Sequence, residues 1–417
     1  MNEELTNLVL PRFLRYVTFC TASDQHSTQT PSSSGQWDLA RALVQDLQDI
    51  GLEEVVLTDH CYVMARLPAS PGKEGQPVIG FMAHLDTVAD VSGNHVKPIV
   101  IERYDGSLIK DAFGNTLLDP AVDSDLGAQI GASLVHTDGS TLLGADDKAG
   151  IAEIMGALDF LLKHPEIKHG ALEIVFSPDE ETGKGLPEFP LNALKACACY
   201  TLDGGGLGEL EMECFNAYRA TVQFQGRITH LGRARGVLVN AASMAACFAA
   251  LLPRSESPEA TDGYYGYYCI MEMSGHLDKA SLEVYIRDFE REGALRRVAA
   301  LESFARTIEA QFPGGTVTLD TKPQYYNMKE KLSLHPVVVE RLKRAFERAR
   351  VNYKMKAIRG GTDGSRLTEL GIPTPNIFTG GHNFHSLNEW ASVPEMSAAC
   401  RVIIELVQEW TRTDLEP

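Results

Sequence analysis

The chain has 417 residues, of which 44% are hydrophobic and 23% are charged. This balance is typical of a globular protein, and the length is sufficient for two domains with separate hydrophobic cores. The 38 basic and 56 acidic residues give a formal net charge of −18, which disfavours nucleic acid or an anionic membrane surface as a partner.

The amino-terminal sequence lacks the features of an export signal. MNEELTNLVLPRFLRYV has no basic segment followed by an uninterrupted apolar stretch, and the longest apolar segment, 241–252, is too short to span a bilayer. The eight cysteines are scattered without the spacing of a disulfide framework, which favours reduced thiols. We therefore expect a cytoplasmic protein.

Helix-like and strand-like segments alternate along the first half of the chain. Leucines at helical spacing predict a helix over 37–51, and the nearly continuous apolar run at 77–86 (PVIGFMAHLD) is typical of a strand buried on both faces. The predicted elements that follow are a helix at 146–164 and strands at 171–177 and 197–203. This alternation predicts an α/β, doubly wound domain with helices on both faces of its sheet.

A different pattern occupies 214–326. Alternating, strand-like segments at 219–227 and 281–291 flank helical patterns near 240–252 and 294–311. We expect a second, smaller α+β domain inserted into the first. The predicted domains are therefore a discontinuous one at 1–213 and 327–417, and an inserted one at 214–326.

The last predicted helix follows the sequence Ser392-Val-Pro-Glu395. Serine followed three positions later by glutamate matches a capping box, in which each side chain bonds a free backbone N–H at the start of a helix. We expect this helix to run to about Trp410.

Groups that bind metals or move protons follow four of the predicted apolar runs. These groups are His84 and Asp86, Asp146 and Asp147, Glu180 and Glu181, and Asp203. Ligands in open α/β sheets lie beyond the carboxyl ends of the strands, so one cleft could collect all four groups. A late segment, GGHNFHSLNEW, adds His382 and His385. Imidazoles and carboxylates in this combination suit a site for two zinc ions.

Each residue also has a structural interpretation when taken alone. His84 could be a hydrogen-bonded core histidine, Asp146 could cap its helix, and Asp203 could belong to a turn before three glycines. The adjacent glutamates could lie on a solvated loop. The glycines do not form a phosphate-binding loop of the G-x-x-x-x-G-K-[ST] type, because that motif is absent. Their joint occurrence favours the metal site.

Six longer motifs connect the chain to a known family. They are TLLGADDKAGIAEIM, PDEETGKG, DGGGLGELE, YIRDFER, YYNMKEK and IRGGTDG, in that order. On these motifs the chain resembles the M20 metallopeptidases nearly end to end, and most closely the tripeptide aminopeptidases of that family. The resemblance implies a zinc-peptidase catalytic domain with an inserted lid domain, two Zn²⁺ per subunit and tripeptides as substrates. Some relatives pair through the inserted domain, so a homodimer stays open, and the sequence does not give the oligomeric state.

The resemblance assigns the metal ligands residue by residue. Asp146 would be the carboxylate that bridges the two zinc ions. His84 and Asp203 would hold one ion, and Glu181 and His385 would hold the other.

Three further residues receive catalytic roles from the resemblance. Glu180 would be the general base, and Asp86 would hydrogen-bond the imidazole of His84 and fix its tautomer. His230 in ITHLGRARG matches a lid histidine that stabilises the oxyanion of the reaction. Leu231 stands where the family usually has proline, so we expect a less rigid loop here.

Substrate contacts are assigned in the same way. Asn240, Arg287 and Arg359 occupy family positions suited to holding the carboxylate or the backbone of a peptide, and Asp363 could pair with its amine. Each of these side chains could instead make an ordinary structural contact.

The two late histidines are distinguished by their spacing from Glu389. The family ligand lies four residues before a glutamate, which selects His385. The preceding Gly380 and Gly381 disfavour a helix, so the two rings are expected to point apart. Relatives often carry tyrosine in place of His382, so this residue is not expected to bind metal.

Two other functions stay open on the sequence. One is a different M20 hydrolase, such as a dipeptidase or an N-acyl amino-acid deacylase. The other is a non-catalytic binding protein on the same scaffold, which the presence of Glu180 disfavours because a binding protein has no need of a general base.

Overall fold

The computed structural model describes residues 1–412, which fold into two compact units. Unit 1 contains Met1–Met212, Glu330–Lys356 and the segment from Thr362 onward. Unit 2 contains Glu213–Lys329 and the short segment Ala357–Gly361. The sequence pattern gave no sign that this short segment belongs with the inserted part of the chain.

Unit 1 is built on an eight-stranded sheet with the order β1-β2-β8-β3-β9-β16-β10-β15. Its strands are β1 (Glu54–Leu57), β2 (Val63–Leu67), β3 (Ile79–His84), β8 (Leu172–Ser177), β9 (Ala198–Gly204), β10 (Glu209–Cys214), β15 (Lys354–Ile358) and β16 (Asn376–Phe378). The four central strands β8, β3, β9 and β16 are parallel to one another, whereas β2 pairs antiparallel with β8, β10 pairs antiparallel with β16, and β1 pairs antiparallel with β2. The carboxyl ends of the central strands therefore lie at one edge of the sheet.

Apolar side chains cover both faces of the central strands. Every residue of β3 and β8 is buried. Phe81 packs against the helical face of the sheet, while the next residue, Met82, packs on the opposite face with Val175 and Cys199. This alternation follows from the two-residue period of a strand, and it explains why the run at 77–86 is apolar throughout.

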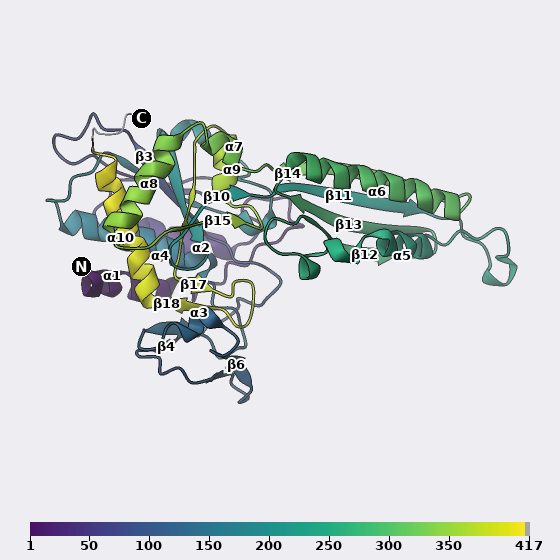
Figure 1. Ribbon diagram of the computed structural model, residues 1–417, viewed down its shortest axis with the longest axis horizontal. Coiled ribbons are helices and arrows are strands. Elements are labelled where there is room, and N and C mark those ends of the chain that lie inside the picture. The colour runs from purple at the N-terminus through teal and green to yellow at the C-terminus, as the bar shows by residue number, and fades with distance from the viewer. Residues whose placement is uncertain (413–417) are drawn as a thin grey trace. The chain divides into compact units, whose positions relative to one another are not determined.

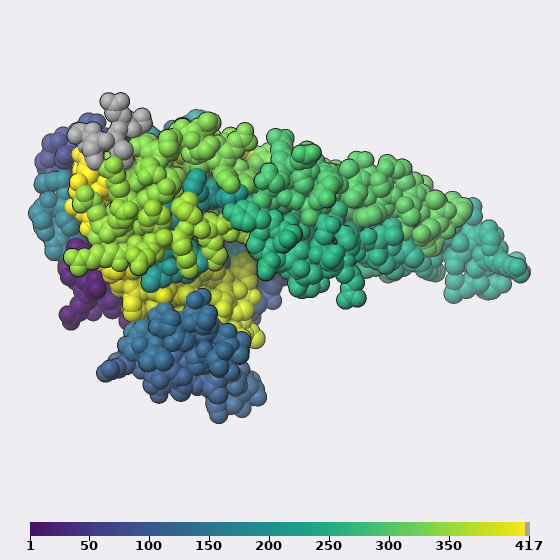
Figure 2. All heavy atoms as spheres, in the orientation of Figure 1, coloured from purple at the N-terminus to yellow at the C-terminus, as the bar shows by residue number. Residues whose placement is uncertain are grey.

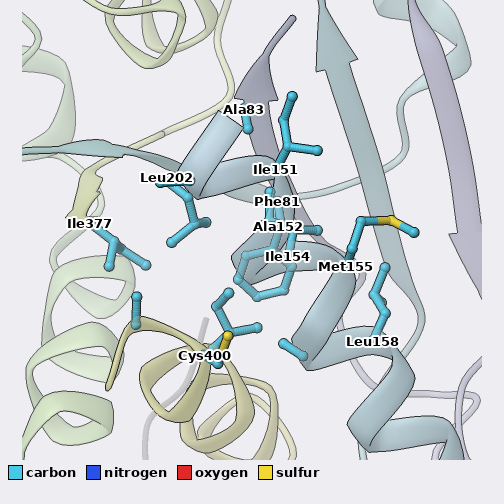
Figure 3. Packing of buried hydrophobic residues seen from close by; sticks show 14 of the residues in the cluster. Phe81, Ala83, Ile151, Ala152, Ile154, Met155, Leu158, Leu202, Ile377 and Cys400 are labelled. Atoms are coloured by element: carbon cyan, nitrogen blue, oxygen red, sulfur yellow. The ribbon is translucent and has the colours of Figure 1, made fainter. Parts of the chain in front are cut away.

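Five helices pack around one large hydrophobic cluster of unit 1. They are α1 (Asn2–Tyr16), α2 (Gly35–Asp49), α4 (Ala145–Lys163), α8 (Pro336–Arg348) and α10 (Val393–Glu409). Figure 3 shows Ile151, Ile154 and Met155 of α4 close to Phe81, with Cys400 of α10 nearby. The opposite face is covered by α9 (Asp363–Glu369) and by the chain before β9. The predicted doubly wound α/β class is confirmed.

A second, smaller sheet in unit 1 was not predicted. Its order is β17-β18-β7-β4, and a two-stranded sheet lies next to it in the chain. These elements are β4 (Ile99–Ile101), β5 (Ile109–Lys110), β6 (Thr116–Leu118), α3 (Ser124–Gly127), β7 (Leu134–His136), β17 (Gly381–His382) and β18 (Trp390–Ser392). In Figures 1 and 2 the blue residues from β4 to β7 form a lobe at the surface of unit 1. Strands of two or three residues are too short to give a periodic sequence signal.

Unit 2 is an antiparallel sheet covered by two helices. The sheet order is β12-β13-β11-β14, and the helices share one hydrophobic cluster with it. The elements are β11 (Asn216–Gln225), α5 (Ala241–Leu251), β12 (Tyr267–Gly275), β13 (Lys279–Asp288), α6 (Arg291–Gln311) and β14 (Thr316–Tyr325). The next helix, α7 (Lys329–Leu332), lies almost wholly in unit 1. This unit contains the elements predicted for it. The strands predicted at 219–227 and 281–291 correspond to β11 and β13, and the two predicted helices correspond to α5 and α6.

The capping box predicted at Ser392 is wrong in its hydrogen bonds. The helix does begin after Ser392, but no side-chain hydrogen bond caps it. Ser392 Oγ instead donates to Gln129 Oε1 at 2.9 Å, and Glu395 Oε1 accepts from Gln129 Nε2 at 2.6 Å. The side chains of Ser392 and Glu395 therefore bond the side chain of Gln129, which is distant in the sequence, and not the backbone at the start of the helix.

Two general features bear on the expected surroundings of the protein. Each of the eight cysteines is a free thiol. Within residues 1–412, no helix is both long and apolar enough to cross a membrane.

Candidate metal centre

The carboxyl edge of the central strands collects the predicted metal ligands. His84 is the last residue of β3, and Asp203 lies near the end of β9. Glu181 lies in the 3₁₀ turn after β8, and His385 follows β16 and β17. Asp146 lies in the first turn of α4. Five residues that are far apart in the sequence thus reach one place because parallel strands end at a common edge.

Asp146 occupies the middle of this cluster. Its Oδ1 atom is 2.8 Å from His84 Nε2, and its Oδ2 atom is 3.0 Å from His385 Nε2. His84 Nε2 also lies 3.7 Å from Asp203 Oδ1, and His385 Nε2 lies 2.8 Å from Glu181 Oε1. The two oxygens of Asp146 therefore face two separate pairs, each made of one histidine and one carboxylate.

The donor set fits divalent cations. Ligand atoms of His84, Asp146 and Glu181 lie within 4.8 Å of one another. Oε1 of Glu181 is buried and has no hydrogen bond of good geometry from any residue in 1–412, although His385 Nε2, which also contacts Asp146, lies 2.8 Å away. A buried carboxylate oxygen without a hydrogen-bond donor is well placed to bind a metal ion, and nitrogen and oxygen ligands suit zinc.

A second group of three potential ligands contains Asp147, which the sequence did not single out as a ligand. Ligand atoms of His84, Asp147 and Asp203 also lie within 4.8 Å of one another. However, both oxygens of Asp147 accept backbone hydrogen bonds, Oδ2 from His84 at 3.1 Å and Oδ1 from Gly150 at 3.2 Å. Asp147 thus fixes the end of β3 against the start of α4, and Asp146 keeps the better position for binding metal.

The charges of the cluster are poorly balanced by protein groups alone. Burial raises the pKa of Asp203 to about 6, and burial together with the charge of Asp146 raises the pKa of Glu181 to about 7. Burial lowers the pKa of His385, but its contacts with Asp146 and Glu181 outweigh this effect and raise the pKa to about 11. Asp203 and Glu181 therefore favour their protonated forms, and His385 favours its cationic form beside Asp146, as expected where a cation would otherwise supply the positive charge.

Glu180 points to the same region without belonging to either ligand group. Burial raises its pKa well above the usual range, and the charges of Asp203 and Glu181 add to this effect. Its neighbour Glu181 takes part in the ligand cluster, so the two adjacent glutamates have different surroundings. This difference agrees with the separate roles that the resemblance gives them.

Asp86 contacts both the imidazole of His84 and the turn that carries the two glutamates. His84 Nδ1 lies closer to the backbone oxygen of Asp86, at 3.0 Å, than to its carboxylate, at 3.4 Å. The two carboxylate oxygens also accept the backbone N–H groups of Glu180 at 3.0 Å and Glu181 at 3.1 Å. Asp86 therefore contacts the imidazole through its main chain and its carboxylate, and its side chain also holds the turn that carries both glutamates.

Asp179 supports the same turn from the other side, and nothing in the sequence pointed to it. It is fully buried with a φ of 61°. Its Oδ1 atom accepts from Gln36 Nε2 at 2.8 Å, and both of its oxygens accept from the backbone of Ser32. The segment at 25–36 thus contributes to the metal centre through these bonds.

His382 has partners that differ from those of His385. Its Nε2 atom is 2.7 Å from Glu395 Oε2, and its ring stacks on Trp390 with centroids 4.0 Å apart. These contacts give the buried ring protein partners on both its edge and its face; that His382 does not bind metal stays a prediction. Asp363, the predicted amine partner, is also buried and accepts a hydrogen bond from Ser177 Oγ at 2.5 Å.

His230 and Asn240 belong to unit 2. The Nδ1 atom of His230 accepts the backbone N–H of Gly232 at 3.1 Å, which leaves the proton of the neutral ring on Nε2. The ring is therefore prepared to donate a hydrogen bond, although Leu231 stands in place of proline. Asn240 caps α5, with its Oδ1 atom accepting from Ser243 N at 3.2 Å.

Arg287 is largely satisfied inside unit 2. The side chain is buried, and Nη1 donates to the backbone oxygens of Tyr218 at 3.3 Å and Ile286 at 3.1 Å. Its guanidinium also lies over the rings of Tyr285 and Tyr325. These contacts hold the arginine within the sheet.

Arg359 has partners different from the predicted substrate carboxylate. Its Nη1 atom donates to the backbone oxygens of Gly263 and Tyr265, both at 2.8 Å, and Nη2 donates to Thr261 Oγ1 at 2.8 Å. The guanidinium also lies over the ring of Phe215. Arg359 thus holds the loop at 261–265, because its guanidinium donates hydrogen bonds to oxygens of that loop.

Comparison with known proteins identifies the family. The model of peptidase family M20/M25/M40 matches residues 133–409. The chain belongs to this family. The resemblance to M20 metallopeptidases that the sequence motifs indicated is therefore confirmed.

Relatives match the M20 chain along nearly its whole length. Peptidase T of Geobacillus sp. (strain WCH70) is 44% identical over 405 residues, covering 97% of this chain and 98% of the relative. Peptidase T of Listeria monocytogenes serotype 4b (strain F2365) is 44% identical over 409 residues, covering 98% of each.

Solved structures show the same fold at lower identity. A tripeptidase from Staphylococcus aureus has a TM-score of 0.77 at 20% identity, covering 98% of this chain and 99% of that one. Aminopeptidase PepT from Bacillus cereus ATCC 10987 has a TM-score of 0.71 at 23% identity, with the same coverage.

Proposed function

We propose that this M20 chain is a di-zinc aminopeptidase that removes the amino-terminal residue from tripeptides. The observation that carries the proposal is the position of Asp146, whose two oxygens face His84 and His385 separately. The match of the chain to relatives named Peptidase T, at 44% identity over nearly the whole chain, supports tripeptides as the substrates.

The proposed ligands form two sets that share Asp146. His84 and Asp203 make one set, and Glu181 and His385 make the other. Zinc ions bound there would polarise the scissile carbonyl and lower the pKa of water. His84 is held through its other ring nitrogen, because Nδ1 lies 3.0 Å from the backbone oxygen of Asp86.

The protein's own groups move the protons. Glu180 accepts a proton from the attacking water and returns it to the departing amine. Asp86 keeps Glu180 in place by accepting its backbone N–H at 3.0 Å. His230 donates from Nε2 to the developing oxyanion, since its Nδ1 atom is already engaged by Gly232.

Recognition of the peptide ends is part of the same proposal. Asp363 is a buried carboxylate whose pKa is raised to about 7, mainly by burial, and it would pair with the substrate's ammonium group. Asn240 and Arg287 would contact the peptide backbone or its carboxylate. The existing contacts of Arg359 favour a supporting role for that residue over a direct one.

Substrate length tests the proposal. The zinc-loaded protein would be assayed on matched di-, tri- and tetrapeptides and on one N-acetylated tripeptide. We expect the highest kcat/KM for the free tripeptide and little turnover of the acetylated one, because acetylation removes the ammonium charge. Preference for the acetylated peptide would indicate a deacylase, and preference for the dipeptide would indicate a dipeptidase. Either result would contradict the proposal.

A further inference from the structure

Glu389 connects two loops that carry proposed metal ligands. Its side chain is buried, with a relative exposure of 2% for the residue. Its Oε2 atom accepts the backbone N–H groups of Leu143 at 2.8 Å and Gly144 at 2.7 Å, and Oε1 accepts that of Asp146 at 3.2 Å. One carboxylate thus binds three backbone donors around the central ligand.

These donors lie at the start of α4, where backbone N–H groups have no partner within the helix. The N-cap residue is Gly144, which has no side chain and a φ of 80°, so it cannot supply the usual capping oxygen. Glu389 supplies that oxygen from a distant part of the chain, and its negative charge is favoured at this end of a helix.

The position of Glu389 is itself fixed by the small sheet. The residue directly precedes β18, in which Ala391 pairs with Val135 of β7. The same loop carries His385, whose Nε2 atom contacts Asp146 Oδ2 at 3.0 Å. The two loops are therefore joined twice. The side chain of His385 contacts that of Asp146, and the side chain of Glu389 binds the backbone of 143–146.

We propose that Glu389 is a positioning residue for the metal centre, which holds the backbone of Asp146 so that its two oxygens face His84 and His385. This inference rests on the metal site of the proposed function. Removing the carboxylate should therefore weaken metal binding in addition to destabilising the fold.

Glu389→Gln is the informative change. Glutamine has one carbonyl oxygen and one NH₂ group, so at least one of the three backbone N–H groups would face another donor. A buried donor left without an acceptor favours movement of the loop. Because the loop contains Asp146, displacement would affect both proposed ion positions.

Glu173 provides a matched control in the same unit. It is also buried, and its Oε2 atom accepts the backbone N–H groups of Lys195 at 2.7 Å and Ala196 at 2.8 Å. It lies opposite Gly80, near the start of β8 and β3, whereas His84 lies at the end of β3. Glu173→Gln removes the same buried charge, but its one carbonyl oxygen can still accept both N–H groups, and the loop of Asp146 is not touched.

The experiment compares zinc binding by the unchanged protein, Glu389→Gln and Glu173→Gln. Each metal-free protein is titrated with zinc in competition with a chromophoric chelator, at a temperature where circular dichroism shows it to be folded. We expect Glu389→Gln to bind zinc about 10- to 100-fold more weakly, the usual effect of losing a residue that supports metal ligands. Glu173→Gln should lose thermal stability but keep the zinc affinity of the unchanged protein.

Equal zinc affinity of the two variants, with a similar loss of stability, would overturn the inference and leave Glu389 a structural residue only. If Glu389→Gln does not fold, Glu389→Asp is compared with Glu173→Asp. Aspartate keeps the charge but is too short to reach all three N–H groups, so weaker zinc binding is again expected, and equal affinity again overturns the inference. Failure of the unchanged protein to bind zinc would instead contradict the proposed function itself.

Discussion

The metal-binding edge of the large sheet and the polar residues of unit 2 are organised in different ways. At the sheet edge, buried carboxylates and histidines contact one another, with Asp146 between His84 and His385. In unit 2, Arg287 and Arg359 are surrounded by backbone oxygens of their own neighbourhood. Crowded acidic groups need a cation for balance, whereas locally satisfied groups need no ligand. The comparison separates residues that require a bound partner for charge balance from residues that the protein itself holds in place.

The largest effect is expected at His385. His385→Ala should lose one zinc equivalent and essentially all activity, because it removes a ligand that faces both Asp146 and Glu181. His382→Tyr is the control, since His382 contacts Glu395 and Trp390 instead. It should keep both zinc ions and measurable tripeptidase activity. Metal analysis with one zinc in the tyrosine variant and two in the alanine variant would reverse the assignment.

The next effect concerns the division of labour between Glu180 and Glu181. Glu180→Gln should keep both zinc ions and lower kcat by about 10²- to 10⁴-fold, since an amide cannot accept the water proton. Glu181→Ala should lose one zinc ion. The measurements are metal content and kcat for both variants. Loss of a metal equivalent from Glu180→Gln would show that the two glutamates are not separated as proposed.

His230 tests whether a residue of unit 2 takes part in the chemistry. His230→Ala should lower kcat by about 10²- to 10³-fold, the usual effect of removing an oxyanion donor, with zinc content unchanged. His230→Gln, which retains a donor, should recover part of the loss. An unaltered kcat in the alanine variant would remove His230 from the mechanism.

The smallest effect is expected at Arg359. Arg359→Ala removes hydrogen bonds to Gly263, Tyr265 and Thr261, so the free energy of unfolding should fall by about 1–3 kcal/mol. KM for a tripeptide should change little. Urea unfolding and steady-state kinetics distinguish the alternatives, because a large rise in KM at unchanged stability would restore the substrate role predicted from the sequence.

The sequence was sufficient to predict the central strands and to propose a set of metal ligands. Long apolar runs ending in His84, Glu181 and Asp203 give both the strands and the place where their ends meet. Asp146 and His385 followed from the family motifs, because short loops between glycines have no periodic pattern of their own. The sequence was therefore enough to propose a ligand set, which stays a prediction.

The supporting residues could not be predicted, because their roles depend on contacts across the fold. Glu389 meets the backbone of Leu143 across 246 positions of sequence, and no local pattern indicates that pairing. Asp86 was assigned to the imidazole, but the backbone N–H groups of the glutamate turn are the nearer partners of its carboxylate. Backbone donors are the same in every residue type, so the sequence does not reveal which ones a carboxylate will meet.

The number of zinc ions bound per chain tests the central claim most directly. Metal analysis after zinc loading and removal of excess zinc would be made on the unchanged protein and on Asp146→Ala. A pair of sites built around one shared carboxylate predicts two zinc ions in the unchanged protein and loss of both from the variant. One zinc ion in the unchanged protein, or two retained in Asp146→Ala, would contradict the account.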